Sequence, residues 1–310
     1  MTINSHVTTF AGLPVVPAGS DVRPDDPGAV AWRVEIEDYD SAPDEFEAAM
    51  EAMLERAGDG GPVALVVGQW GGAYEEPPPI DLFVRLAPRM PGLRSLFLGD
   101  LTFEECEISW IRHRDVAPLL KAYPALERLV VRGTEDLQIT EALRHEGLRD
   151  LEIQSGGLPA KLLRSVLALE LPALERLNLW LGVDSYGGDV VGEDLRPVLD
   201  EADARWPRLT ALGLRNSEMQ DRIAASVAES AVLPRLRVLD LSLGTLGDEG
   251  AESLLGGGSL DHLEELDLHH HFMSPQVAQR LVDALPGVRV DVTDRQEPRG
   301  DWGRYVEVSE

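Results

Sequence analysis

The hexapeptide Leu236-Arg237-Val238-Leu239-Asp240-Leu241 is the stretch from which the fold can be predicted. Its pattern, L-x-x-L-x-L, returns as Leu263-Glu264-Glu265-Leu266-Asp267-Leu268 and stands earlier as Leu174-Glu175-Arg176-Leu177-Asn178-Leu179. Two leucines separated by one residue point to the same face of a strand. The repetition therefore predicts a series of similar strands that stack side by side, each burying its leucine pair against its neighbours.

Similar apolar pairs occur along almost the whole chain. They are Val34/Ile36, Leu65/Val67, Leu96/Leu98, Leu129/Val131, Leu151/Ile153, Leu177/Leu179, Leu212/Leu214, Leu239/Leu241, Leu266/Leu268 and Val290/Val292. Their mean spacing is about 28 residues, which is at the long end of the range for leucine-rich repeats and leaves room for a helix in each repeat. The spacing favours a leucine-rich-repeat solenoid of about ten repeats.

Helical patterns fill the segments between these pairs, and prolines often separate a helix from the next strand. We expect helices at 44–56, 115–122, 159–169, 218–231, 248–255 and 274–285, the last with Ser274 as N-cap before Pro275. The predicted fold class is therefore α/β: a curved parallel β-sheet on the concave side and α-helices on the convex side. Residues 1–29 are expected to form an irregular leader that packs on or caps the first repeat, 30–295 the solenoid, and 296–310 a C-terminal cap that includes a short strand at 305–308.

Charge and composition exclude several classes of partner. The chain has 310 residues, 28 basic and 55 acidic side chains and a net charge of −27. This charge argues against nucleic acid and against an anionic membrane surface. There is no membrane-spanning or signal sequence, and Cys106 is the single cysteine, so we expect a cytoplasmic protein without disulfides.

Several phrases of the chain resemble a known group of proteins. They include Gln69-Trp70-Gly71-Gly72-Ala73-Tyr74, Trp180-Leu181-Gly182-Val183-Asp184-Ser185-Tyr186 and Leu214-Arg215-Asn216-Ser217-Glu218. With the repeats, they make the chain similar to bacterial, more narrowly actinobacterial, leucine-rich-repeat proteins of ribonuclease-inhibitor-like repeat length. The resemblance implies the fold and brings no assigned activity. One departure is that Thr134, Ser217, Gly244 and His271 stand where the general repeat has Asn or Cys, which predicts irregular turns.

The residues between the paired leucines should face the concave side. In order they are Glu35, Val66, Phe97, Val130, Glu152, Asn178, Gly213, Asp240, Asp267 and Asp291. Neighbouring strands lie about 4.8 Å apart, so the last three aspartates should form a like-charge ladder. Such a ladder is a solvated acidic stripe, a site for a basic side chain, or a metal site.

The triplet His269-His270-His271 is typical of a metal site only if its side chains share one face. A turn is expected here, with His269 beside Asp267 on the concave face and His271 inside the turn, where it would replace the usual asparagine. Ligands that point in different directions argue against a shared metal ion.

Long loops rich in aromatic residues and glycine leave the strands' C-terminal ends at 70–76, 99–110 and 180–189. Their aromatic residues either form a recognition surface or fold back as loop cores. Together with the concave column they give the candidate binding residues Trp70, Tyr74, Phe97, Trp180, Asp184, Tyr186, Arg215, Asp240, Asp267 and His269.

No catalytic sequence motif is found, which favours a non-catalytic protein-interaction module with no cofactor and no metal. The predicted partner is a protein, which the acidic surface suggests is basic. Two alternatives remain: a metal-dependent enzyme that uses Asp240, Asp267 and His269, and a structural subunit of a larger assembly.

Overall fold

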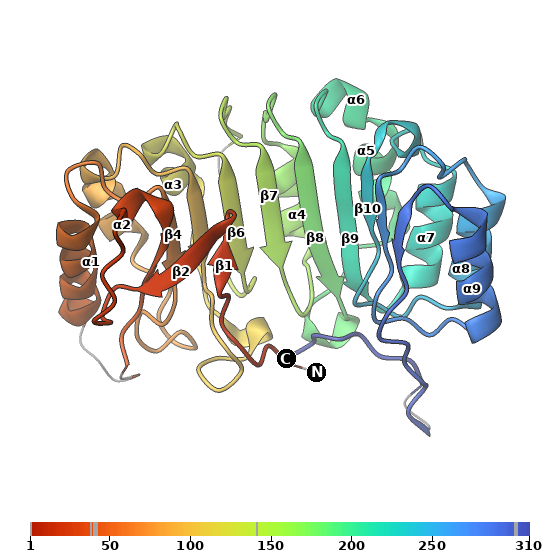
Figure 1. Ribbon diagram of the computed structural model, residues 1–310, viewed down its shortest axis with the longest axis horizontal. Coiled ribbons are helices and arrows are strands. Elements are labelled where there is room, and N and C mark those ends of the chain that lie inside the picture. The colour runs from red at the N-terminus through yellow and green to blue at the C-terminus, as the bar shows by residue number, and fades with distance from the viewer. Residues whose placement is uncertain (1, 38, 40–42, 141, 301–302) are drawn as a thin grey trace. The chain divides into compact units, whose positions relative to one another are not determined.

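The computed structural model describes residues 2–37, 39, 43–140, 142–300 and 303–310, so residues 301–302 of the expected C-terminal cap lie outside it. The chain forms two compact units. We call residues 2–154 with 169–171 the N-terminal unit, and residues 155–168 with 172–309 the C-terminal unit. Each is built from parallel strands joined by helices, which confirms the predicted α/β solenoid of leucine-rich-repeat type (Figure 1).

In the N-terminal unit, strands β2 to β7 pair in parallel in sequence order, and β1 pairs antiparallel with β2. The strands are β1 Thr9–Phe10, β2 Leu13–Pro17, β3 Ala31–Val34, β4 Ala64–Val67, β5 Ser95–Leu98, β6 Arg128–Arg132 and β7 Asp150–Gln154. The helices are η1 Pro27–Ala29, α1 Pro43–Ala57, α2 Ile80–Leu86, η2 Ala87–Arg89, η3 Ile108–Trp110 and α3 Ala117–Ala122.

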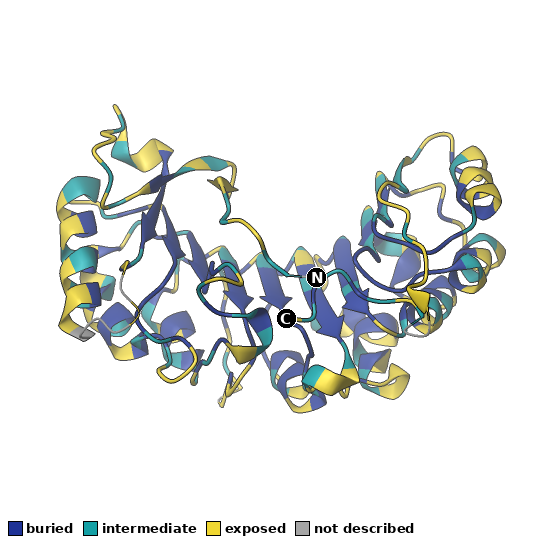
Figure 2. Cartoon of the chain, turned by 90° about the horizontal axis from the view of Figure 1, so that it is seen from below, coloured by how far each residue is buried: buried dark blue, intermediate teal, exposed yellow. Residues whose placement is uncertain are grey.

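In the C-terminal unit, strands β8 to β12 pair in parallel in sequence order. The strands are β8 Arg176–Gly182, β9 Ala211–Ser217, β10 Val238–Asp240, β11 Glu265–Asp267 and β12 Arg289–Asp291. The helices are α4 Ala160–Leu167, η4 Asp184–Tyr186, α5 Gly192–Asp200, α6 Ala202–Arg205, α7 Gln220–Ala228, η5 Leu233–Arg235, α8 Asp248–Gly256 and α9 Pro275–Ala284. In each unit the helices lie along one face of the strands and expose their outer sides (Figure 2). We call the other face of the strands the open face.

The predicted register is confirmed from β4 to β7 in the N-terminal unit and from β8 to β12 in the C-terminal unit, because the inward residues of successive strands lie opposite one another. It is wrong for the first strand. There Trp32 aligns with Leu65 and Val34 with Val67, so the inward pair is Trp32/Val34 and not Val34/Ile36. A shift of two residues leaves each side chain on its original face, so alternation alone could not detect it. Arg33, not Glu35, therefore precedes Val66 in the open-face column.

The helices expected between strands all form; α3, α4, α7 and α9 are shorter than expected, whereas α1 and α8 are slightly longer. Ser274 caps α9 as expected, because its hydroxyl accepts a hydrogen bond from the Val277 amide at 3.4 Å. Helices α2, α5 and α6 were not expected. The α5 helix has Pro197 in its interior, which hides its pattern because proline usually ends a helix.

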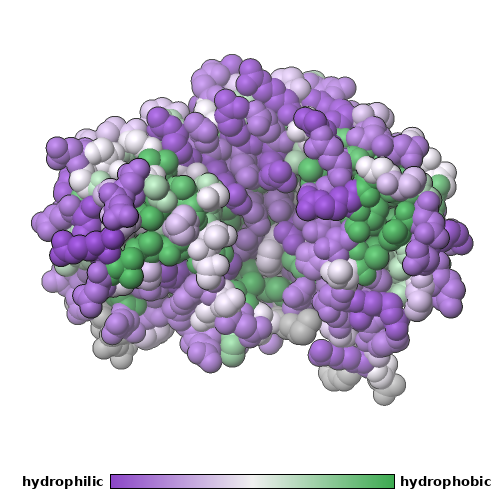
Figure 3. Space-filling view, in the orientation of Figure 1, coloured by the Kyte–Doolittle hydropathy of each residue, from purple (hydrophilic) through white to green (hydrophobic). Residues whose placement is uncertain are grey.

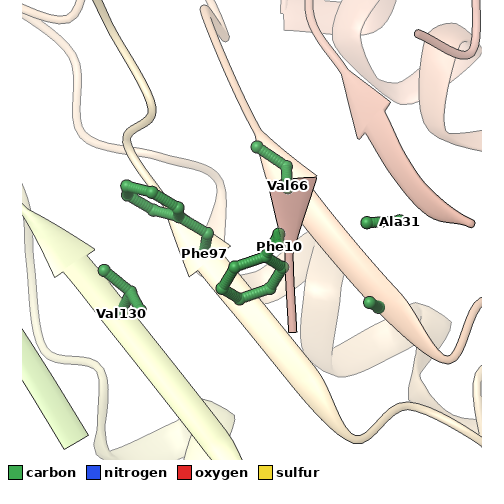
Figure 4. Packing of buried hydrophobic residues seen from close by; sticks show 6 residues of the cluster. Phe10, Ala31, Val66, Phe97 and Val130 are labelled. Atoms are coloured by element: carbon green, nitrogen blue, oxygen red, sulfur yellow. The ribbon is translucent and has the colours of Figure 1, made fainter. Parts of the chain in front are cut away.

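The leader differs from the expected irregular segment, because residues 9–17 form the β1–β2 hairpin. Strand β2 adds an edge strand beside β3, and β1 folds back across the open face of the N-terminal unit (Figure 1). Phe10 packs there on Ala31, Val66, Phe97 and Val130 (Figure 4). The leader therefore covers an apolar part of this face.

The turns after the strands are more regular than the missing asparagines predict. In the C-terminal unit, Asn216, Leu243, His270 and Asp294 all have left-handed backbone, with φ of 56°, 67°, 54° and 56°. Each stands two residues after the inward pair of its repeat. We call these four residues the turn column. Its regularity corrects the expectation of irregular turns.

The C-terminal tail, residues 303–309, runs along the turn column. Asn216 donates to the Val308 carbonyl at 2.5 Å and accepts from the Val308 amide at 3.0 Å. The Glu307 amide donates to the Leu243 carbonyl at 2.8 Å. The tail is thus held by side chains and single amides, and residues 305–308 do not form the expected strand.

Candidate functional site

A central column of side chains runs across the strands on the open face of the C-terminal unit. The central column is Asn178, Gly213, Asp240, Asp267 and Asp291, each aligned with the next across neighbouring strands. The three aspartates therefore lie on consecutive strands, as the sequence predicts. We call Asp240, Asp267 and Asp291 the acidic column. All three are only partly exposed, which strengthens their mutual repulsion relative to fully solvated carboxylates.

Asp240 is held by the neighbouring strand and by its own turn. Its carboxylate lies 3.1 Å from Nε of Arg215 and accepts hydrogen bonds from the Ser242 amide at 3.1 Å and the Ser242 hydroxyl at 2.6 Å. Burial raises the pKa of Asp240, the Arg215 guanidinium opposes that rise, and the charge of Asp267 adds to it. A further cation at this position would favour the ionised form.

Asp267 pairs with His269 from the same strand end. The two side chains lie 2.7 Å apart, between His269 Nδ1 and Asp267 Oδ1. Burial tends to raise the pKa of Asp267, but the hydrogen bonds from His269 outweigh it and the pKa is lowered. The same hydrogen bond to Asp267 raises the pKa of His269. Both pKa changes favour the charged forms, so each group is ionised more readily in the pair than it would be alone.

Trp180 and Asn178 border the acidic column on β8. The Arg215 guanidinium lies 5.4 Å from the centroid of the Trp180 ring. Trp180 is 7% exposed, less than expected of a concave-face contact residue. Nε1 of Trp180 and Oδ1 of Asn178 are buried and have no hydrogen-bond partner. Trp180 and Asn178 thus each bury one unpaired polar atom on β8.

Gly213 leaves space for the Asn178 side chain. A Cβ atom at Gly213 would lie 2.4 Å from Asn178 Oδ1. Glycine here lets the amide lie flat over the neighbouring strand, a close approach that the sequence did not indicate.

The three histidines point in different directions, as predicted. His269 joins Asp267 on the open face, His270 contacts the Tyr305 carbonyl at 3.2 Å, and Nε2 of His271 contacts the Val292 carbonyl at 2.9 Å. Nδ1 of His271 accepts from the Met273 amide at 3.1 Å. His271 therefore replaces the turn asparagine, and its burial lowers its pKa and keeps it neutral.

The ligand atoms of Asp267, His269 and Asp291 lie within 4.8 Å of one another and could hold a metal ion. This set differs from the Asp240, Asp267 and His269 set proposed from the sequence, because Asp240 pairs with Arg215 instead. Nδ1 of His269 is already engaged by Asp267, so a metal ion would have to displace that hydrogen bond.

The candidate residues of the N-terminal unit are placed less favourably. Trp70 is 5% exposed and its Nε1 donates to the Glu76 carbonyl at 2.9 Å, so it is a loop-core residue and not part of an exposed recognition surface. Phe97 is 2% exposed beneath Phe10, so it is not an accessible open-face contact (Figure 4). Tyr74 remains exposed. The apolar run Val66, Phe97 and Val130 was the signal that this face is covered.

Asp184 and Tyr186 lie away from the acidic column, on η4 at the strand-end edge of the C-terminal unit. Asp184 is exposed, and Tyr186 lines a pocket of about 670 Å³ with Glu218, Arg299 and Arg304. The sequence did not place the two arginines here, because they come from the C-terminal end of the chain. They make this edge less acidic than expected.

A scan against protein-family models and a search of curated proteins find no match to the chain. Among solved structures, a Bacteroides fragilis protein determined by a structural genomics consortium is 34% identical, with a TM-score of 0.77, over 88% of this chain and 77% of that chain. The two chains share a fold. The TLR13–ssRNA13 complex aligns at 15% identity and a TM-score of 0.32, over 77% of this chain and 37% of that chain, and supports no argument.

Most of the surface seen in Figure 3 is hydrophilic, in keeping with the net charge of −27. Among the described residues, none of the helices combines the length and apolarity needed to span a bilayer.

Proposed function

We propose that the chain is a non-catalytic protein-binding module whose acidic column binds a basic segment of a partner protein. The observation that carries the proposal is the alignment of Asp240, Asp267 and Asp291 on three consecutive strands. The leucine-rich-repeat-like fold supports it, because stacked repeats present a row of side chains from neighbouring strands along one continuous surface.

The charges of the cluster are incompletely balanced. Arg215 offsets Asp240 and His269 offsets Asp267. Asp291 accepts hydrogen bonds from the Thr293 amide at 2.9 Å and hydroxyl at 2.7 Å, and it has no cationic partner among the residues that the structure describes. A lysine or arginine of a partner would reduce the repulsion between the three carboxylates.

Trp180 and Asn178 lie on β8 beside the acidic column, but their unpaired polar atoms are closed to a partner. Trp180 is 7% exposed, and both its Nε1 and Oδ1 of Asn178 are buried. The lysine or arginine side chains of a partner would therefore bind at the partly exposed carboxylates. The proposed partner segment is basic, with its cations over the acidic column.

The test is fluorescence polarisation with a labelled hexa-arginine peptide at low and physiological salt. Asp267→Asn and Asp291→Asn should each weaken binding, the double variant by at least about tenfold, since a desolvated charge pair contributes more than 1.4 kcal/mol. Glu193→Gln, on the exposed face of α5, is the matched control and should bind as the wild type does.

Equal affinity of the double variant and the control would overturn the proposal, as would binding that does not weaken with salt.

The alternative of metal-dependent catalysis has one supporting observation, the proximity of Asp267, His269 and Asp291. It predicts that Zn²⁺ or Mn²⁺ binds wild type and not Asp291→Asn. It also predicts that the metal competes with the hexa-arginine peptide.

A further inference from the structure

A second group of potential ligands lies outside the acidic column, where the C-terminal tail crosses the turn column. It consists of His270 and Asp294, from successive turns, and Glu307, from the tail. Nδ1 of His270 lies 3.4 Å from Oδ2 of Asp294 and 3.8 Å from Oε2 of Glu307. All three ligand atoms lie within 4.8 Å of one another.

The hydrogen bond on the other side of the His270 ring fixes which nitrogen carries the proton. Nε2 lies 3.2 Å from the Tyr305 carbonyl, which can only accept, so Nε2 carries a hydrogen. In the neutral ring Nδ1 then presents a lone pair toward two carboxylates. A metal-bound histidine has this same arrangement, with its far nitrogen donating to a carbonyl.

The histidine of this group is buried, and two of the group's polar atoms are unsatisfied. His270 is 0% exposed, and both its Nδ1 and Glu307 Oε2 lack a hydrogen-bond partner. The rings of Phe272 and Tyr305 pack on His270 at centroid distances of 6.0 Å and 5.7 Å. A lone pair that faces carboxylates in such surroundings is unfavourable unless a cation lies between them.

The cation between these atoms is either a metal ion or a proton on Nδ1. The distances between the three atoms distinguish the two. A protonated Nδ1 would draw a carboxylate oxygen to about 2.7–2.9 Å. Zinc bonds of about 2.0–2.1 Å at tetrahedral angles place neighbouring ligand atoms about 3.3–3.4 Å apart. The observed 3.4 Å and 3.8 Å are closer to the second arrangement.

We propose that His270, Asp294 and Glu307 bind a divalent transition-metal ion of the Zn²⁺ class, which fastens the C-terminal tail to the turn column. Asp294 is 51% exposed at its side chain, so the fourth coordination position opens to water. The site joins two turns to a tail that is also held by hydrogen bonds, the Arg304–Asp221 ion pair and the buried side chains of Val306 and Val308, so occupancy would further stabilise the tail's docking.

The other group of potential ligands, Asp267, His269 and Asp291, allows the two sites to be compared. Nδ1 of His269 is hydrogen-bonded to Asp267 at 2.7 Å, whereas Nδ1 of His270 is unpaired. The ion should therefore prefer the site on the turn column, and this proposal does not depend on peptide binding by the acidic column.

The experiment is Zn²⁺ titration by calorimetry of full-length protein that carries no histidine tag and has been stripped with a chelator. Wild type should bind one Zn²⁺ per chain at this site. Glu307→Gln and Asp294→Asn should each weaken binding at least about 100-fold, because each loses a direct ligand. Direct ligands matter more than the second-shell contacts whose loss alone weakens metal binding about 10- to 100-fold. Asp267→Asn is the matched control and should keep the wild-type affinity.

Hydrogen exchange and NMR supply readouts that do not depend on affinity. Zn²⁺ should slow exchange of the Glu307 and Val308 amides and shift the ring resonances of His270 but not of His269. No binding by wild type overturns the proposal, and so does loss of binding in Asp267→Asn alone. Both ligand variants replace partly exposed side chains, and circular dichroism confirms that they fold.

Discussion

Replacing Phe10 by alanine should selectively destabilise the N-terminal unit. The ring is 4% exposed and packs on four aliphatic side chains and on Phe97, whose centroid lies 5.7 Å away. The Arg128 guanidinium lies 5.2 Å from its centre. Loss of a buried phenylalanine side chain typically costs about 3–5 kcal/mol. We expect the low end, about 3 kcal/mol, because water can enter a gap at the surface of a sheet more easily than a cavity in a core.

For a unit of about this size, such a loss lowers the melting temperature by about 6–12 °C. Urea unfolding followed by tryptophan fluorescence measures the loss in free energy of unfolding, since Trp32, Trp70 and Trp110 all lie in this unit. Phe103→Ala removes the same ring where it is 39% exposed and should change the free energy of unfolding by no more than about 0.5 kcal/mol. Equal effects of the two variants would refute the conclusion that Phe10 closes the open face of this unit.

Three other predictions concern polar groups. Asp100 is 0% exposed and forms ion pairs with the buried Arg33 and Arg132, so Asp100→Ala should lower the free energy of unfolding in urea by about 3–5 kcal/mol. A loss below about 1 kcal/mol would contradict a stabilising role of these two ion pairs. His269 has a raised pKa, so its contribution to stability is complete below about pH 6.5, the unfolded value, and is lost as pH rises through the folded pKa. The titration midpoint of His269, measured by NMR, should lie above about 6.5 and should fall in Asp267→Asn. An unchanged midpoint would show that Asp267 does not raise the pKa of His269. His271→Ala should cost about 1–3 kcal/mol in thermal or urea unfolding because it leaves buried backbone groups unpaired, and His271→Asn should recover part of this loss.

The positions and register of the strands could be predicted from the sequence, because the leucine pattern of each repeat defines its register independently. Leu239 and Leu266 align as their positions in the hexapeptide predict, and the aspartates that follow them align with them. The first strand lacks a leucine signature, so its register depended on alternation alone and was wrong by two residues. Local patterns therefore predicted where side chains face wherever the pattern included a fixed reference point.

The sequence was insufficient wherever a side chain's environment comes from a distant segment. A tryptophan among glycines has the same local pattern whether it is exposed or folded back, and only the position of the Glu76 carbonyl decides for Trp70. His270 could not be connected to Glu307, because the tail that brings them together has no repeat pattern. Left-handed turns at non-glycine residues were likewise not evident from composition.

The open faces of the two units differ in the side chains of their central columns. In the N-terminal unit the central column runs from Arg33 to Glu152, and its middle part, Val66, Phe97 and Val130, is apolar and therefore unfavourable in water unless it is covered. The chain's own leader covers it. In the C-terminal unit the same column is acidic, which water tolerates, and its carboxylates retain partial exposure. The central columns of the two units thus differ: the apolar residues of one are covered by the chain's own leader, and the aspartates of the other keep part of their exposure, which is the basis for proposing a binding face there.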